Sequence, residues 1–218
     1  MENFNNIELL NEEEKKLSSY KEYLEDLAIN NNNGVIFNAG KAHASILMAT
    51  LLANTCKSLK MYCTGLRPDI LDGFQGSYWD VFQKFFERID SEHFKKNSIQ
   101  ILLQEDDRIE EMKKNPDKIT PFSILKKATK KFPNIIVIKK IKADGKKKIE
   151  DDLGGLPQVK SDYNINFSVF DNKAFRLEYM PKEYKAIGSF DNVDWCKRLS
   201  CCFDGVFNNQ NLSQPVVL

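Results

Sequence analysis

Residues 164–189 have the types and spacing that could bind an anion. Asn164 and Asn166 lie two positions apart, so they share one face of an extended strand. This strand ends at Asp171, and Gly188 and Ser189 follow a second alternating segment. Backbone N–H groups and a small hydroxyl can hold an anion there, whereas asparagine offers hydrogen bonds but neither a nucleophile nor a charge. The pattern therefore predicts a ligand-binding pocket rather than a catalyst.

Arg176 and Glu178 belong to the same stretch. They are two positions apart, so they lie on one face of its second strand. If the two side chains are buried, they shape the pocket. If they are exposed, they form a surface pair that contributes little to stability. Both interpretations fit the sequence.

His43 and His93 are the only imidazoles. His43 follows a predicted strand, and α/β sheets bind ligands at the carboxyl ends of their strands. His43, with Lys41 and Asp171, is thus a candidate catalytic group of a phosphodiesterase or nuclease. The alternative is an ordinary histidine on a helix surface or in the core. For His93 we expect a charge-placement role at the end of a helix.

No cofactor or metal ion is expected. The five cysteines include no CxxC pair, and Cys201 and Cys202 are adjacent, so they point apart. The junction 37–41 is similar to a phosphate loop, but its glycine spacing is wrong, and Ala42 occupies the position of the magnesium-binding Ser or Thr. A glycine that closes a strand-to-helix turn explains this junction better.

A lysine-rich segment spans residues 126–148, with ten lysines and a single acid, although the chain as a whole carries a formal charge of only +1. Lysines of this segment could follow a nucleic-acid backbone. The candidates are Lys130, Lys131, Lys146, Lys147 and Lys148. The alternative is that the first lysines form the solvated face of a helix.

The elements that must position these residues alternate between helix and strand. Helices are predicted at 12–27, 41–56, 78–94, 119–132 and 192–207, and strands at 34–37, 59–63, 98–103 and 134–138, before the hairpin of 164–189. This order predicts an α/β fold with a layered mixed sheet flanked by helices, parallel in its first part and antiparallel from the hairpin.

Three parts are expected: an N-terminal helical extension (1–33), an α/β domain (34–207) and a tail (208–218). Residues 139–162, with their glycines and lysine run, are expected to form a mobile loop or lid. No apolar run approaches the ~20 residues of a membrane span. The odd cysteine count and polar N-terminus favour a reduced, cytoplasmic setting.

The element order over roughly residues 34–207, together with the closing stretch, resembles one half of the phospholipase D-like superfamily. The family signature is His-x-Lys, four residues, then Asp, with Gly-Ser and Asn downstream. Counted back from Asp171, Asn166 takes the Lys position and Asn164 the His position, and Gly188-Ser189 match the Gly-Ser. In the family the His attacks phosphorus and the Lys neutralises the phosphate, and asparagine does neither.

The resemblance implies a catalytically degenerate protein that binds a phosphate-bearing ligand or nucleic acid, or scaffolds a larger complex, for instance in bacterial antiviral defence. Family enzymes assemble two halves around one pocket, so it also implies a homodimer or a related partner chain. Two alternatives stay open: a phosphodiesterase or nuclease that uses His43, and a pure protein-interaction module whose partner surfaces are the acidic N-terminal helix and the Phe-rich helix at 78–94.

Overall fold

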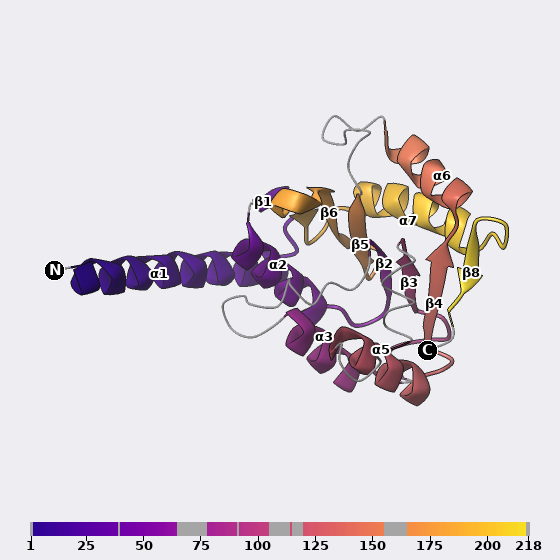
Figure 1. Ribbon diagram of the computed structural model, residues 1–218, viewed down its shortest axis with the longest axis horizontal. Helices are drawn as coiled ribbons and strands as arrows, with labels where there is room; N and C mark the ends of the chain where they lie inside the picture. Colours follow the sequence, from indigo (N-terminus) through magenta and orange to yellow (C-terminus); the bar gives the residue numbers. More distant parts are fainter. Residues whose placement is uncertain are drawn as a thin grey trace.

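The chain forms a mixed β-sheet with helices on both faces, as Figure 1 shows for the computed structural model. The structure describes residues 2–38, 40–64, 78–90, 92–104, 114, 120–154 and 165–216. Within these ranges the helices are α1 (Glu2–Ile29), α2 (Lys41–Ala53), α3 (Tyr78–Glu87), α5 (Thr120–Lys131), α6 (Ala143–Leu153) and α7 (Val193–Phe207), with the 3₁₀ helix η2 (Pro181–Glu183). The predicted α/β class with a mixed, helix-flanked sheet is confirmed.

Eight strands of the described residues form one sheet, in the order β1-β7-β6-β5-β2-β3-β4-β8. They are β1 (Ile36–Asn38), β2 (Leu59–Cys63), β3 (Ile99–Leu103), β4 (Ile136–Ile141), β5 (Asn166–Phe170), β6 (Ala174–Met180), β7 (Lys185–Ser189) and β8 (Ser213–Pro215). The parallel part is β2-β3-β4, and every other pairing is antiparallel.

The sequence predicts that the first strand belongs to the parallel part of the sheet, and this prediction is wrong. β1 pairs antiparallel with β7 at the far edge of the sheet. It is only partly buried, because Phe37 is 68% exposed while Ile36 and Asn38 are buried. An edge strand has one free side, which explains the short, half-exposed element.

Two apolar cores lie on the two faces of the sheet. One is formed with α1, α2, α3 and α5, and the other with α6 and α7. Figure 1 shows these two groups of helices on opposite sides of the strands. Alternation along β6 decides which side chains meet which core: Phe175 and Leu177 face α7, so Arg176 and Glu178 face the side of α1 and α2.

The segment predicted as a mobile lid is ordered structure over most of its length. β4 continues to Ile141, and residues 143–153 form α6 with Lys142 and Gly154 at its ends, while residues 155–162 of the predicted lid lie outside the described residues. Ile149 and Leu153 are fully buried in the core that α6 shares with α7. A Cβ at Gly145 would lie 2.4 Å from the Leu212 carbonyl oxygen, so this glycine permits the close packing of α6. Burial of one apolar face outweighs the polar composition.

The segment predicted as a tail also contributes to the fold. Residues 213–215 form β8, which pairs antiparallel with the end of β4. Ser213 is buried, and its hydroxyl donates to the carbonyl oxygens of Val206 and Phe207 at the end of α7. The C-terminal segment therefore closes one edge of the sheet.

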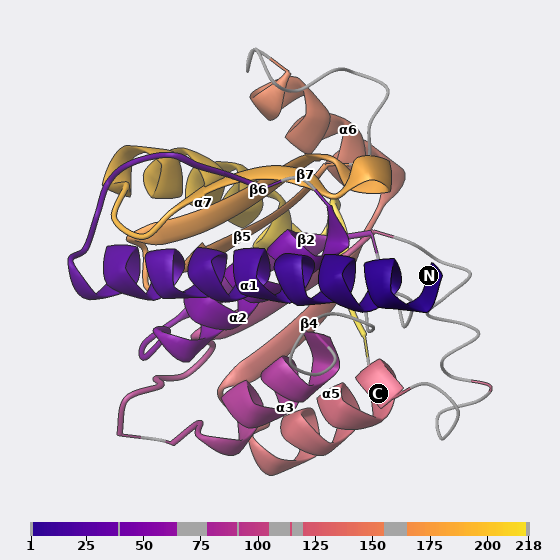
Figure 2. The ribbon, with the colours of Figure 1, turned by 90° about the vertical axis from the view of Figure 1, so that its left-hand side faces the viewer.

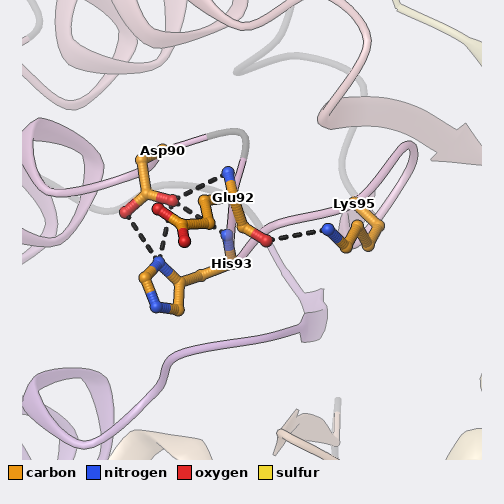
Figure 3. A network of polar contacts seen from close by, with 4 residues as sticks. All are labelled: Asp90, Glu92, His93 and Lys95. Carbon is orange, nitrogen blue, oxygen red and sulfur yellow. Dashed lines mark hydrogen bonds and ion pairs between the residues drawn. The ribbon is translucent and has the colours of Figure 1, made fainter.

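The aromatic-rich helix is shorter than the predicted range of 78–94, because α3 ends at Glu87. A separate turn follows, and Figure 3 shows its contacts. The Asp90 carboxylate accepts the backbone N–H groups of Glu92 and His93 at 3.0 and 2.8 Å and lies 2.9 Å from His93 Nδ1. The His93 backbone N–H is the main cause of a lowered pKa of Asp90, with the His93 side chain contributing next. His93 thus helps to stabilise an exposed turn that follows α3.

Candidate polar site

A network of polar side chains, buried except for the half-buried Asn166, lies where β2 and β3 end and β5 begins. Thr64 and Gln104 follow these two parallel strands directly, so the topology brings them to the same edge. Asn166, the first residue of β5, binds both. Its Oδ1 accepts the Thr64 backbone N–H at 2.8 Å, the Thr64 hydroxyl at 3.1 Å and Gln104 Nε2 at 3.3 Å. Asn166 therefore ties β5 to the carboxyl ends of β2 and β3.

The other half of the Asn166 amide faces β6. Asn166 and Glu178 are register partners, and Asn166 Nδ2 donates to Glu178 Oε2 at 2.7 Å. The second Glu178 oxygen, Oε1, lies 3.0 Å from Arg176 Nη2. Both charged side chains are buried, at 9% exposure for Arg176 and 7% for Glu178. Of the two sequence interpretations, the structure shows the buried pair, and the network carries no net charge.

Hydrogen-bonding capacity remains at the edge of this network. Within the described residues, Arg176 Nε, Gln104 Oε1 and the Tyr20 hydroxyl are buried without a hydrogen-bond partner. Burial raises the pKa of Tyr20 to about 12, against the opposing effect of the Arg176 charge. The tyrosine therefore stays protonated at neutral pH and can donate a hydrogen bond.

Asp171 does not belong to this network. It lies at the other end of β5, five residues from Asn166, which is roughly 16 Å along a strand. Its Oδ2 accepts the Cys56 N–H at 2.9 Å, and its Oδ1 accepts the Lys57 and Ser58 N–H groups at 2.8 Å each. Asp171 thus holds the connection from α2 to β2.

The backbone at this point forms a left-handed turn. Asp171 and Asn172 have φ of 52° and 57°, and the Lys173 N–H donates to the Phe170 carbonyl at 3.1 Å. Asp and Asn tolerate this left-handed backbone better than other residues with side chains. The predicted turn between the two alternating segments is thus confirmed, with a structural use for its aspartate.

Gly188 and Ser189 serve packing in this structure. Gly188 is the register partner of Arg176, and a Cβ there would lie 2.9 Å from the Phe175 carbonyl oxygen and 3.3 Å from Leu47 Cδ2 of α2. Ser189 is fully buried, and its hydroxyl lies 3.5 Å from the Asn32 carbonyl. Of the predicted ligand-binding set, Asn166, Arg176 and Glu178 come together, Gly188 lies beside them, and Asp171 and Ser189 do not join. Asn164 lies outside the described residues.

His43 lies in the first turn of α2 and packs edge-on against Tyr20 of α1, with ring centroids 4.6 Å apart. Asp171 binds the loop after the last turn of the same helix. Ten helical residues, about 15 Å, separate the two positions. The combination of His43, Lys41 and Asp171 does not form one site. Gly40, with φ of 91°, closes the strand-to-helix turn, as predicted for the 37–41 junction.

The lysine-rich segment is divided between the two faces of the sheet. Lys130 and Lys131 end α5 on one side, and Lys146, Lys147 and Lys148 lie in α6 on the other, as Figure 1 shows. In α6, two of the three pair with acids one turn later: Lys146 with Glu150 at 4.0 Å, and Lys148 with Asp152 at 3.1 Å. The segment therefore presents two separate groups of lysines instead of one surface.

Two further lysines of this segment, Lys139 and Lys142, and Lys60 of β2 stabilise α7. Lys139 Nζ donates to the Phe207 carbonyl at 2.6 Å, Lys142 Nζ donates to the Gln210 carbonyl at 2.7 Å, and Lys60 pairs with Asp204 at 2.6 Å. Cations near the carboxyl end of a helix stabilise its dipole. Much of the lysine content is thus used for folding.

Thr64, Gln104 and Tyr20 were not anticipated from the sequence. Thr64 and Gln104 could have been found as the first polar residues after two buried strands, since such positions in parallel strands share an edge. Tyr20 gave no such indication, because it follows the apolar spacing of a docked helix. The described part of the chain holds no group of three or more His, Cys, Asp or Glu side chains placed to bind a metal ion. None of its described helices is long and apolar enough to cross a membrane.

No protein-family model matches the chain, and no curated protein matches it. Among solved structures, the chain superposes on TrmBL2, described as an archaeal chromatin protein with a novel mode of DNA binding. The TM-score is 0.49 at 13% identity, over 97% of this chain and 66% of that one, so the chain spans just under two thirds of TrmBL2. A likeness at this level assigns no function.

Proposed function

We propose that the chain is a catalytically silent, phospholipase D-like subunit that works as a scaffold by assembling with a second copy of itself. The proposal joins the sequence resemblance to two features of the structure. One is the chemistry of the Asn166 network, and the other is the shape of α1.

The network offers hydrogen bonds without the groups of phosphodiester hydrolysis. Asn166 stands at the position of the family lysine, and both ends of its amide are already bonded to the protein. The cation of the network, Arg176, is buried against Glu178. Hydrolysis of the family type needs a nucleophilic imidazole and a cation that meets the phosphate. In this chain the charges of Arg176 and Glu178 neutralise each other, so among its described residues no cation is left to meet a phosphate at the network. This supports a structural role for the network.

The main observation in support of a scaffold role is the length of α1. Its 28 residues span about 42 Å. Leu24 and Leu27 are buried in the core, and Leu17 and Tyr20 pack against it. Figure 2 shows this part in front of α2, whereas in Figure 1 the amino-terminal part extends away from the rest of the molecule. Helices in water gain most of their stability from tertiary packing, so an extending helix is well suited to bind a partner.

Two measurements on the full chain test this function. Light scattering after size exclusion should give a dimer mass over a range of micromolar concentrations. The generic substrate bis(p-nitrophenyl) phosphate should show no turnover. A monomer at all concentrations contradicts the scaffold, and turnover that is lost in His43→Ala contradicts catalytic silence.

Nucleic-acid binding is the second candidate, because Lys127, Lys130 and Lys131 are all exposed on α5. The two lysine groups lie on opposite faces, so one of them should dominate. We expect fluorescence anisotropy with duplex DNA to show binding that falls steeply with salt and weakens in Lys130→Ala/Lys131→Ala more than in Lys146→Ala/Lys147→Ala/Lys148→Ala. Salt-independent or absent binding contradicts this candidate. Binding of a phosphate-bearing ligand at the Asn166 network and a role in bacterial defence stay predictions.

A further inference from the structure

A groove of about 440 Å³ runs over α2, between α1 and α3. Lys21 and Glu25 of α1 line one wall, and Val81, Lys84 and Phe85 of α3 line the other. None of the residues that line the groove belongs to the Asn166 network.

The floor of the groove suits close approach of another helix. Ala49 and Ala53 lie one turn apart on α2 and both line the groove, together with Leu52. Small side chains at this spacing leave room for a second helix, and the neighbouring apolar groups give it a surface to bury. Arg88 ends the groove and is held in place, since Nη2 donates to the Leu52 carbonyl and, at 3.1 Å, to the Thr55 carbonyl.

The rim of the groove is basic. Lys21, Lys84 and Arg88 carry positive charge, against one acid, Glu25, which lies 3.7 Å from Lys21. The matching acidic surface lies on the same chain. Residues 12–14 of α1 are three successive glutamates, all exposed. They precede Leu17, which packs against the core.

We propose that the amino-terminal arm of α1, residues 2–16, lies in the α1–α2–α3 groove of a second copy, and that the second copy returns the same contact. This proposal rests on the scaffold function above and names its interface. α1 supplies both the arm and one wall of the groove, so two antiparallel α1 helices related by a two-fold axis make the exchange reciprocal. The glutamates of residues 12–14 then meet the lysines of the partner's rim.

Charge reversal in the full chain tests the arrangement. Lys84→Glu should weaken the dimer, as should Glu13→Lys, each by about tenfold or more in Kd, because like charges then face each other. The combined variant Lys84→Glu/Glu13→Lys should recover most of the lost affinity. Lys127→Glu, the same charge change on α5 away from the groove, should leave Kd unchanged. Sedimentation equilibrium gives Kd, and circular dichroism confirms that each variant is folded.

A zero-length carboxyl-to-amine crosslink gives a second readout. In mixed ¹⁴N/¹⁵N dimers, Glu12–Glu14 should crosslink to Lys84 or Lys21 of the other isotope. A dimer whose Kd is unchanged by both reversals, or whose arm crosslinks only within one chain, overturns the arm-in-groove interface and leaves the scaffold standing. A protein that is monomeric throughout overturns both.

Discussion

Asn166 Nδ2 donates to Glu178 Oε2 at 2.7 Å across two neighbouring strands, at the position where the family resemblance places a lysine. A neutral amide there leaves Glu178 with one cation, Arg176, instead of two. The charges of the site are balanced within the protein, and the network joins β2, β3, β5 and β6 into one edge. Changes to this network should therefore be seen first in the free energy of unfolding of the protein.

Loss of the Glu178 carboxylate should be costly. Glu178→Ala leaves Arg176 buried without its counter-ion and removes the acceptor of Asn166 Nδ2. Breaking one side of a buried pair costs about 3–5 kcal/mol of unfolding free energy. Urea denaturation should show a large fall in midpoint. The control is Glu183→Ala, whose partner Lys185 lies 2.6 Å away in an exposed pair and whose loss should cost about 0–1 kcal/mol. Equal effects would contradict the buried pair.

Gly188→Ala should destabilise the protein by about 1–3 kcal/mol, because the added methyl group meets the Phe175 carbonyl and Leu47. The matched control is Gly205→Ala in α7. A Cβ at Gly205 meets only Lys148 Cε, at 3.5 Å, so there the better helix propensity of alanine should stabilise by up to about 1 kcal/mol. Thermal unfolding of both variants measures the difference, and the expected sign is opposite for the two.

Asp171→Ala removes the acceptor of three backbone N–H groups in residues 56–58. We expect a loss of about 1.5–3 kcal/mol, the range for hydrogen bonds to a charged group. The dimer mass should not change. Asn172→Gly, in the same turn, keeps the carboxylate and a backbone suited to positive φ, so its unfolding midpoint should stay close to that of the natural chain. If Asp171→Ala leaves the midpoint unchanged, the structural role assigned to Asp171 is wrong.

The cysteines of α7 should differ in reactivity although two of them are adjacent. Cys201 is exposed, whereas Cys196 and Cys202 are buried. Burial raises the pKa of Cys196 to about 12 and that of Cys202 to about 11. The thiolate is the reactive form, so at pH 8 both stay protonated, and raising the pH to 9 still leaves nearly all of each as thiol.

Iodoacetamide labelling followed by mass spectrometry checks this order. Cys201 and the exposed Cys56 should react first, and Cys196 and Cys202 only after denaturation in urea. Comparable labelling of Cys201 and Cys202 in the folded protein would contradict a burial of Cys202 against the core and an exposure of Cys201 to solvent.

The sequence predicted the alternation of elements well, because period-two and helical spacing reflect burial on one face. It placed the hairpin correctly from the residues at Asp171 and Asn172. It failed where distant partners decide the outcome. Ile149 and Leu153 make residues 143–153 a helix only because α7 covers them, and residues 213–215 become a strand only because β4 offers an edge.

The same limit applied to the candidate site. Spacing put Asn166 and Asp171 on one strand but did not say that their side chains would serve opposite ends of it. Gln104 and Thr64 join Asn166 through a strand order in which β5 lies beside β2, and this order follows from long-range pairing. Local patterns do not contain that information.

The pairing of β1 with β7 has a consequence for biosynthesis. Asn38 donates through Nδ2 to the Tyr184 carbonyl, 146 positions further along the chain. During translation the first strand therefore emerges long before its only sheet neighbour among the described strands. Until then Ile36 depends on α1 and α2 or on chaperones for shelter, and this edge of the sheet forms only after residues 185–189 have been synthesised.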